Sequence, residues 1–156
     1  MKEINLTQGQ VALVDDEDFE YLNQFKWCVT KSKNLRTFYA QREYHSNTII
    51  MHRVIMGTPK GTFVDHIDHN GLNNQKSNLR NITPHQSAFN RQKPNINTTS
   101  KYKGVCYDKG HFKATIKKDG KSRHIGSFKT EFEAALAYDI MAKELFGEFA
   151  CLNFTQ

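Results

Sequence analysis

The chain has 156 residues, of which 38% are hydrophobic, and a formal net charge of +6. This length accommodates one ordinary domain, or two small domains joined by a linker. No apolar run reaches the roughly 20 residues that a bilayer-spanning helix needs. The first ten residues also lack the apolar core of a signal peptide. We therefore expect an intracellular protein without a membrane segment.

The cysteines Cys28, Cys106 and Cys151 are few, odd in number and widely separated. Such usage argues against a disulfide framework and against a cysteine-based zinc site. It suits a reducing compartment.

The positive charge is concentrated in the middle of the chain. Residues 95–129 hold nine Lys and Arg against two Asp and Glu, a net charge of +7, and residues 51–94 carry +4. Residues 1–50 carry −1 and residues 130–156 carry −4. A basic block of this kind favours a polyanion partner that is bound through its phosphates. A merely solvated lysine-rich surface is the alternative that charge alone leaves open.

The first 57 residues predict a small α+β region. Four acidic residues at positions 15–18 suit the positive end of a helix, and apolar residues follow at near-helical spacing. Three short strands are predicted next, because the stretches are rich in β-branched or aromatic residues: Trp27–Lys31, Thr37–Arg42 and Thr48–Ile55.

The next segment predicts strand, long loop, strand and helix. The strands are Phe63–Ile67 and Leu79–Thr83, and the polar stretch Asp68–Ser77 lies between them. A helix should begin at Pro84, because Thr83 can cap it and proline is tolerated at the first helical position.

A linker is predicted at 92–100, where the sequence is polar, contains a proline and shows no periodicity. Three strands follow at Lys103–Tyr107, Phe112–Lys117 and Ser122–Phe128. The pair Asp119-Gly120 between the last two strands is a strong hairpin signal.

A helix is predicted from Thr130, with Glu133 in the capping-box position, to Gly147. Its predicted apolar side consists of Phe132, Ala135, Leu136, Tyr138, Ala142 and Leu145. One helix packed over a three-stranded antiparallel sheet would bury a small but sufficient core. The overall fold class is therefore α+β.

Residues 64–70 place two carboxylates and two imidazoles in one strand end and its loop, and several asparagines follow. Hydrolysis of a phosphodiester needs an activated water, a cation and stabilisation of the leaving oxygen. A neutral histidine can take the proton of the water, and carboxylate and amide oxygens suit a hard cation. Asx turns beside exposed histidines are the alternative for such a stretch. The joint spacing of Asp65, His66 and Asn78, followed by a capped helix, favours the catalytic interpretation.

The motifs Met51–Gly57, Val64–His66, Asn74, Ser77–Arg80 and Asn90-Arg91 resemble those of the HNH nucleases. These nucleases have the ββα-metal fold and include many phage homing endonucleases. The resemblance covers residues 1–91.

The resemblance implies that Asp65 ligates a divalent metal ion, magnesium or else manganese, and that His66 is the general base. It implies that Asn78 orients and braces His66. Ser87 aligns with the asparagine that usually supplies a second ligand from the helix. Asn90 lies one turn later on the same helical face and offers a better ligand oxygen, so we predict Asn90 as the second ligand.

A second resemblance lies in residues 100–154, in the stretches Tyr102–Val105, Ile125–Phe128, Glu133–Ala135, Ala137–Asp139 and Leu152–Phe154. They are similar to the APETALA/ethylene-response DNA-binding domain, which lays a three-stranded sheet in the major groove. Alternation along the middle strand predicts that Phe112, Ala114 and Ile116 face the helix. The predicted DNA contacts are Lys103, Lys113, Thr115, Lys117, Arg123 and His124, together with Arg80 of the nuclease region.

We therefore expect a ββα-metal nuclease module in residues 1–91, a linker in 92–100 and a DNA-binding domain in 101–156. The expected function is that of a metal-dependent, sequence-directed homing endonuclease, which cleaves double-stranded DNA in a bacterial or phage-infected cell and needs no protein partner. The alternative is a DNA-binding regulator with an inactive nuclease module, which Ser87 would permit. RNA fits less well, because the major groove of A-form RNA is deep and narrow.

Overall fold

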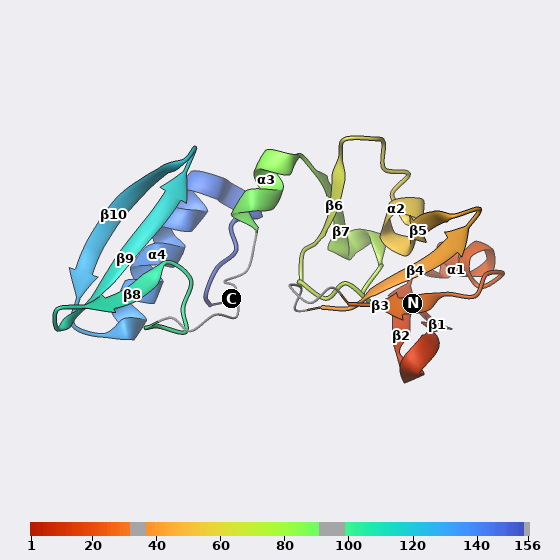
Figure 1. Cartoon of the computed structure of the whole chain (residues 1–156), viewed down its shortest axis with the longest axis horizontal. Coiled ribbons are helices and arrows are strands. Elements are labelled where there is room, and N and C mark those ends of the chain that lie inside the picture. Colours follow the sequence, from red (N-terminus) through yellow and green to blue (C-terminus); the bar gives the residue numbers. More distant parts are fainter. Residues whose placement is uncertain (32–36, 91–98, 155–156) are drawn as a thin grey trace. The chain divides into compact units, whose positions relative to one another are not determined.

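The computed structural model describes residues 1–31, 37–90 and 99–154, and it has the mixed α+β fold expected from the sequence (Figure 1). The chain divides into two compact units, Met1–Pro84 and His85–Gln156. Most of the predicted linker lies outside the described residues, so the domain boundaries proposed above remain a prediction.

The first unit combines small antiparallel sheets with short helices. Its elements are β1 (Lys2–Asn5), β2 (Val11–Val14), α1 (Asp16–Leu22), β3 (Cys28–Thr30), β4 (Tyr39–Tyr44), β5 (Asn47–Ile50), α2 (Met51–Ile55), β6 (Phe63–His66) and β7 (Leu79–Ile82). Strand β1 pairs with β2, β4 lies between β3 and β5, and β6 pairs with β7.

The core of this unit is an apolar cluster contributed by most of these elements. Its buried members are Ile4, Leu6, Ala12, Val14, Leu22, Trp27, Val29, Ala40, Met51 and Leu72. The Trp27 indole is fully buried and donates to the carbonyl oxygen of Leu22 at 2.8 Å, which ties the end of α1 to the chain entering β3. Buried tryptophans usually find such a partner for the ring N–H.

The predicted strand Thr48–Ile55 is correct only up to Ile50, where β5 ends. The remaining residues, Met51–Ile55, form helix α2 instead. Met51 and His52 are both buried, at 0% and 8% exposure. Neighbouring residues of a strand point to opposite faces, whereas a helical turn lets both be buried on one side. Strands β1 and β2 were not predicted, because each has only four residues and the turn between them carries little signal.

The second unit consists of a three-stranded antiparallel sheet packed on one long helix, as expected (Figure 1). Its elements are β8 (Val105–Asp108), β9 (His111–Lys118), β10 (Lys121–Phe128) and α4 (Glu131–Phe146). The short helix α3 (Pro84–Phe89) begins where the sequence predicts, and all of it after Pro84 belongs by its contacts to this unit. None of the helices in the described ranges has the length and apolarity that crossing a bilayer requires.

Helix α4 has the predicted capping box at Thr130 and Glu133, and it ends at Gly147. The prediction that Phe132 and Leu136 lie on its buried side is wrong, because they are 56% and 45% exposed. The buried residues of α4 are Ala134, Ala135, Tyr138, Asp139, Ala142 and Phe146. The alanines let the helix approach the sheet closely, which leaves the bulky side chains at its flanks.

The alternation predicted for β9 is confirmed. Ala114 and Ile116 are buried at 0% and 3% exposure, and Lys117 is exposed. Gly104 makes the close packing possible where the chain enters β8. It has a φ of +75°, and a Cβ atom there would lie only 2.1 Å from the Tyr138 ring of α4.

Candidate functional site

Asp65 and His66 are the last two residues of β6 and lie opposite Arg80 and Leu79 of β7. Because neighbouring residues of a strand point to opposite faces, the two side chains have different surroundings. Asp65 faces Arg80, whereas the His66 side chain is buried at 5% exposure.

The Asp68 carboxylate organises the loop that follows β6. It accepts hydrogen bonds from Asn70 N at 2.8 Å, from Asn73 Nδ2 at 2.8 Å and from Asn78 Nδ2 at 2.9 Å. Burial alone would raise the pKa of Asp68, but these three hydrogen bonds outweigh it and lower the pKa. Asn78 Oδ1 accepts from Asp68 N in return, so the two side chains close the loop on itself.

This loop is anchored to the first elements of the chain. Leu13 N of β2 donates to Leu72 O, and Asn74 N donates to Leu13 O, both at 2.8 Å. The carboxylate of Asp15, at the start of α1, accepts from Lys76 N at 2.7 Å. The acidic stretch at 15–18 therefore supports the loop as well as the positive end of a helix.

The buried His66 side chain contacts one polar and two aromatic side chains of the first unit. Its Nε2 is 3.1 Å from Oδ1 of Asn74, which is fully buried. The His66 ring meets the His52 ring edge to face, with centroids 5.0 Å apart, and the Tyr39 ring lies 5.7 Å away. The hydrogen bonds of the Asn78 side chain go instead to Asp68 and to Asn73 O, so Asn78 acts on the loop beside His66.

Burial sets the protonation of this cluster. It lowers the pKa of His66, although the hydrogen bond with Asn74 and the charges of Asp68 and Asp65 oppose the effect. Burial, together with the nearby charges of His66 and Arg53, lowers the pKa of His52 to about 3. Both imidazoles are therefore neutral at neutral pH, and a neutral imidazole is the form that can accept a proton.

Asp65 is joined to Arg80 across the strand pair. Arg80 Nε and Nη2 lie 2.9 and 2.8 Å from the same carboxylate oxygen, Oδ2, and both side chains are largely buried. Arg80, which was predicted to contact DNA, thus contacts the predicted metal ligand.

The donor set fits a hard cation that keeps much of its water. Within the described ranges, no three His, Cys, Asp or Glu side chains gather in a way that could hold a metal. Magnesium commonly binds through one or two carboxylates and retains several waters, so a site with the single carboxylate Asp65 suits it. The cation would share the Asp65 carboxylate with Arg80.

Asn90 follows α3 directly and is 7% exposed, and its N–H donates to Gln86 O at 3.3 Å. Ser87 lies within α3 and is partly buried. Both belong to the second unit, whereas Asp65 belongs to the first. The metal role of Asn90 therefore remains a prediction.

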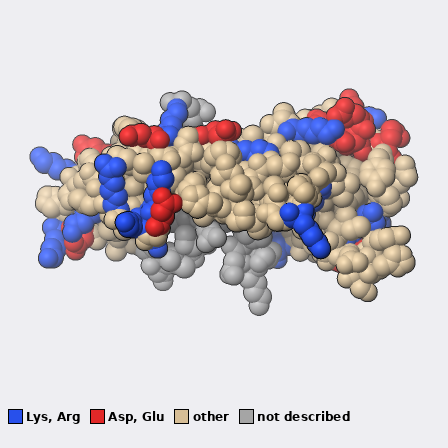
Figure 2. Space-filling view, turned by 90° about the horizontal axis from the view of Figure 1, so that it is seen from above, with Lys and Arg blue, Asp and Glu red and all other residues tan. Residues whose placement is uncertain are grey.

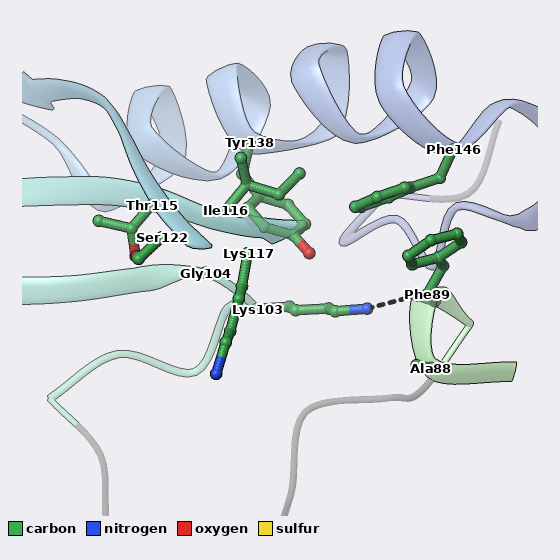
Figure 3. A pocket seen from close by; sticks show the side chains of 10 residues that line it. All are labelled: Ala88, Phe89, Lys103, Gly104, Thr115, Ile116, Lys117, Ser122, Tyr138 and Phe146. Carbon is green, nitrogen blue, oxygen red and sulfur yellow. Dashed lines mark hydrogen bonds between the residues drawn. The ribbon is translucent and has the colours of Figure 1, made fainter. Parts of the chain in front are cut away.

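Helix α3 is held by side chains of the second unit. Phe89 stacks on Phe146 of α4, with ring centroids 4.2 Å apart, and His85 Nε2 lies 3.0 Å from Asp119 Oδ1 in the β9–β10 turn. Lys103 Nζ donates to Phe89 O at 2.9 Å, at the carbonyl end of the helix (Figure 3). Cations favour that end of a helix.

A cavity of about 260 Å³ lies beside this contact. Three of the predicted DNA contacts, Lys103, Thr115 and Lys117, line it together with Phe89 and Tyr138. In Figure 3 the Lys103 side chain extends toward Phe89, and that of Lys117 points elsewhere.

The register of β9 and β10 sorts the predicted DNA contacts between the two faces of the sheet. Thr115 lies opposite His124, and residues directly opposite each other in an antiparallel pair share a face. Arg123 lies opposite Ile116 and therefore projects from the face that carries α4. The outer face thus combines Thr115 and Lys117 with His124.

Lys113 is engaged within the protein, because its ammonium group contacts the carboxylate of Asp108 in β8. That hydrogen bond raises the pKa of Lys113. In the view of Figure 2, both Lys and Arg side chains and acidic side chains are scattered over a surface formed mostly by other residues.

His52 and Tyr39 were not singled out from the sequence as part of the site. His52 lies in a stretch of β-branched residues and Tyr39 in a predicted strand, so both resemble ordinary structural positions. The one available signal was that His52 falls within the motif Met51–Gly57.

A pair of strands that presents adjacent Asp and His, followed in the chain by a short helix, is the arrangement expected of HNH nucleases. The chain is 38% identical over 148 residues to an uncharacterised HNH endonuclease of Acanthamoeba polyphaga mimivirus. The match covers 94% of this chain and 76% of that protein. It is also 35% identical over 94 residues to Protein 3.8 of Escherichia phage T7. This match covers 59% of this chain and 76% of that protein. The chain belongs to the HNH endonuclease family.

The chain is also similar to an AP2-like ethylene-responsive transcription factor of Arabidopsis thaliana, at 30% identity over 80 residues. The match spans 51% of this chain and 23% of that protein. The sheet β8–β10 packed on α4 is the arrangement of the AP2 domain. No protein-family model and no solved structure matches the chain.

Acid should destabilise the first unit through His52. Its pKa is about 3 in the folded chain and about 6.5 when unfolded, so the unfolded chain takes up the proton first as the pH falls. Stability is therefore full above about pH 6.5 and falls toward pH 3, by up to ~1.4 kcal/mol per pH unit from this group. His66 contributes in the same direction.

The measurement is urea unfolding over a pH series, followed by the fluorescence of Trp27, the single tryptophan. His52→Phe keeps a ring against His66 and should flatten the pH dependence. Exposed His45, whose φ is 45°, provides the control His45→Asn, which should leave the pH dependence as it is. An unchanged slope in His52→Phe would show that His52 is not the group responsible.

Proposed function

We propose that the protein is a metal-dependent endonuclease of the homing type, which cleaves double-stranded DNA at a site chosen by its C-terminal domain. The observation that carries the proposal is the neutral, immobilised His66 next to Asp65 at the end of β6. Membership of the HNH endonuclease family supports it independently.

In the proposed reaction, neutral His66 accepts a proton from a water molecule. The water oxygen forms a bond to phosphorus, the bond from phosphorus to the leaving oxygen breaks, and the leaving oxygen takes a proton from solvent. Asp65 and Asn90 would hold a divalent cation, magnesium or manganese, which supplies positive charge to offset the charge that develops on the phosphate. Arg80, on the Asp65 carboxylate, holds that ligand in place.

The C-terminal domain supplies the affinity for DNA in this proposal. The major groove admits a two-stranded β-ribbon, and the outer face of the β9–β10 pair carries Thr115, Lys117 and His124. The net charge of +7 in residues 95–129 favours contact with phosphates. Lys103 and Lys113 would have to leave their present partners to contribute.

A second candidate function is DNA binding without cleavage. Ser87, where the family usually has an asparagine, favours it, because a hydroxyl is a poorer neutral ligand than an amide oxygen. The two functions separate in one experiment. Binding to duplex DNA in the presence of a chelator, with no cleavage after magnesium is added, would identify the second.

His66→Ala should reduce cleavage by about 100-fold or more, since a positioned general base contributes about 10²–10⁴-fold. The assay incubates the full chain with a pool of duplex DNA in magnesium or in chelator and maps the cut ends. The control is His45→Asn, at an exposed histidine of the same unit. Cleavage by His66→Ala at the wild-type rate, with the fold intact by circular dichroism, would reject His66 as the base.

Asn90→Ala should raise the magnesium concentration for half-maximal cleavage by about tenfold or more, and Ser87→Ala should change it little. The reason is that an amide oxygen is the better ligand for a hard cation. Ser87→Asn, which restores the usual family residue, provides the matched test of a weakened site and should increase activity. The opposite ranking of the two alanine variants would assign the ligand to Ser87.

Lys117→Gln should weaken binding to all duplex sequences similarly and reduce the salt dependence of affinity. The slope of log affinity against log salt should fall by about 1, because one phosphate contact is lost. Lys143→Gln, at an exposed lysine of α4, should leave the slope unchanged. Binding is measured by fluorescence anisotropy in chelator, and equal slopes for wild type and Lys117→Gln would remove Lys117 from the interface.

A further inference from the structure

We propose that the outer face of α4 is a docking surface for a second copy of this chain, whose own α4 packs against it in the antiparallel direction. The face is centred on Leu136 and lies on the side of the helix that points away from the sheet β8–β10 (Figure 1). It includes no residue of the nuclease site and none of the proposed DNA contacts, so the inference goes beyond the proposed function.

Three large apolar side chains of α4 are left uncovered by the fold. Phe132, Leu136 and Ile140 are 56%, 45% and 63% exposed. They follow one another at intervals of four residues, so they form a single ridge along the helix. A helix on the surface of a domain normally carries polar residues on the side away from the core. The core does not account for the ridge, because α4 packs on the sheet through other residues, among them Tyr138 and Ala142.

The ridge continues onto the C-terminal segment. The centroid of the Phe132 ring lies 5.0 Å from that of Phe154, which in turn lies 5.2 Å from the ring of Tyr102. These contacts hold the Phe132 ring in place while more than half of the residue stays exposed. A side chain that is already ordered loses little conformational entropy when a partner covers it.

The charges beside the ridge exclude a polyanion as the partner. The exposed charged residues of α4 are Glu133, Lys143 and Glu144, and residues 130–156 carry a net charge of −4. An apolar ridge with acidic margins would repel both DNA and an anionic lipid surface. A protein surface that offers apolar side chains together with a cation fits it better.

A second α4 in the antiparallel direction provides both. A two-fold axis at Leu136 places Phe132 of each copy beside Ile140 of the other, so the same ridge serves both copies. Along the helix axis, the arrangement brings Lys143 to within about 6 Å of Glu133 of the second copy, which a lysine side chain spans. A parallel pair would instead place Glu133 beside Glu133 and Lys143 beside Lys143, and like charges in contact are unfavourable.

The size of the ridge indicates weak association. Three side chains exposed to this extent present on the order of 300 Å², a size at which a patch on a monomer is often functional. Stable interfaces bury about 800 Å² on each partner. The ridge is therefore too small for a tight dimer, and we expect a dissociation constant of about 0.1–1 mM.

The test is sedimentation equilibrium of the full chain, without DNA or metal, at concentrations up to about 1 mM, with NMR spectra over the same series. We expect a monomer–dimer equilibrium in which the chemical shifts of α4 and the C-terminal segment change with concentration. A chain that stays monomeric would overturn the proposal and leave a different protein as the occupant. Shift changes confined to other elements would also overturn it. Neither measurement needs a variant to fold.

Leu136→Glu places a charge at the centre of the pair and should raise the dissociation constant by about tenfold or more. DNA affinity in chelator should not change, because the outer face of the sheet lies opposite to α4, so this result is separate from the proposed function. The matched control is Tyr107→Glu, at a residue of β8 that is 49% exposed, and it should leave association as it is. Equal dissociation constants for Leu136→Glu and wild type would count against the proposal.

Charge variants test the direction of the pair. Lys143→Glu should weaken association, because the new carboxylate would face Glu133 of the second copy. Adding Glu133→Gln should recover part of the loss, since it removes the repulsion. Glutamine can keep the capping contact that Glu133 makes with Thr130 N. Absence of any recovery, with the helix content unchanged by circular dichroism, would reject the antiparallel arrangement.

Discussion

The reciprocal hydrogen bonds between Asp68 and Asn78 are the interaction on which the candidate site depends. Asn78 Nδ2 donates to the Asp68 carboxylate, and Asp68 N donates back to Asn78 Oδ1. These bonds join the two ends of the loop between β6 and β7, and the loop in turn presents Asn74 to His66. A flexible loop of this length would not hold one amide oxygen against one ring nitrogen. The protein thus uses polar side chains to hold the shape of this loop.

In the second unit, too, a carboxylate and an asparagine side chain hold segments of the chain together. The buried carboxylate of Asp139 on α4 accepts from Asn153 N, Asn153 Nδ2 and Phe154 N. The Asn153 side chain then bonds both backbone groups of Lys103. The C-terminal segment, the helix and the entry to the sheet are joined by one carboxylate and one amide. Lys103 is thereby fixed at its backbone while its ammonium group reaches α3.

Elements with a strong local signal were predictable from the sequence. The capping box at Thr130 and the alternation in β9 specify structure within a few residues of themselves. What the sequence could not provide depended on contacts distant in the chain. Met51 and His52 are both buried in a helix, and Met51 belongs to a core cluster that includes Ile4 and Val14, which are distant in the chain. The roles of Asn74 and Asn78 could not be separated by spacing, because both are asparagines of one loop and only the fold shows which amide reaches His66.

The stacking of Phe89 on Phe146 bears on how such proteins can be assembled from parts. The natural place to join a nuclease module to a DNA-binding domain is the polar stretch after α3. A chimaera joined there would combine Phe89 from one parent with whatever residue the other parent has at the position of Phe146. Exchange of DNA-binding domains between relatives is therefore constrained by this aromatic pair, together with the contacts of His85 with Asp119 and of Lys103 with Phe89 O. Swaps that carry α3 along with the new domain, or that keep an aromatic residue at both positions, preserve the contact.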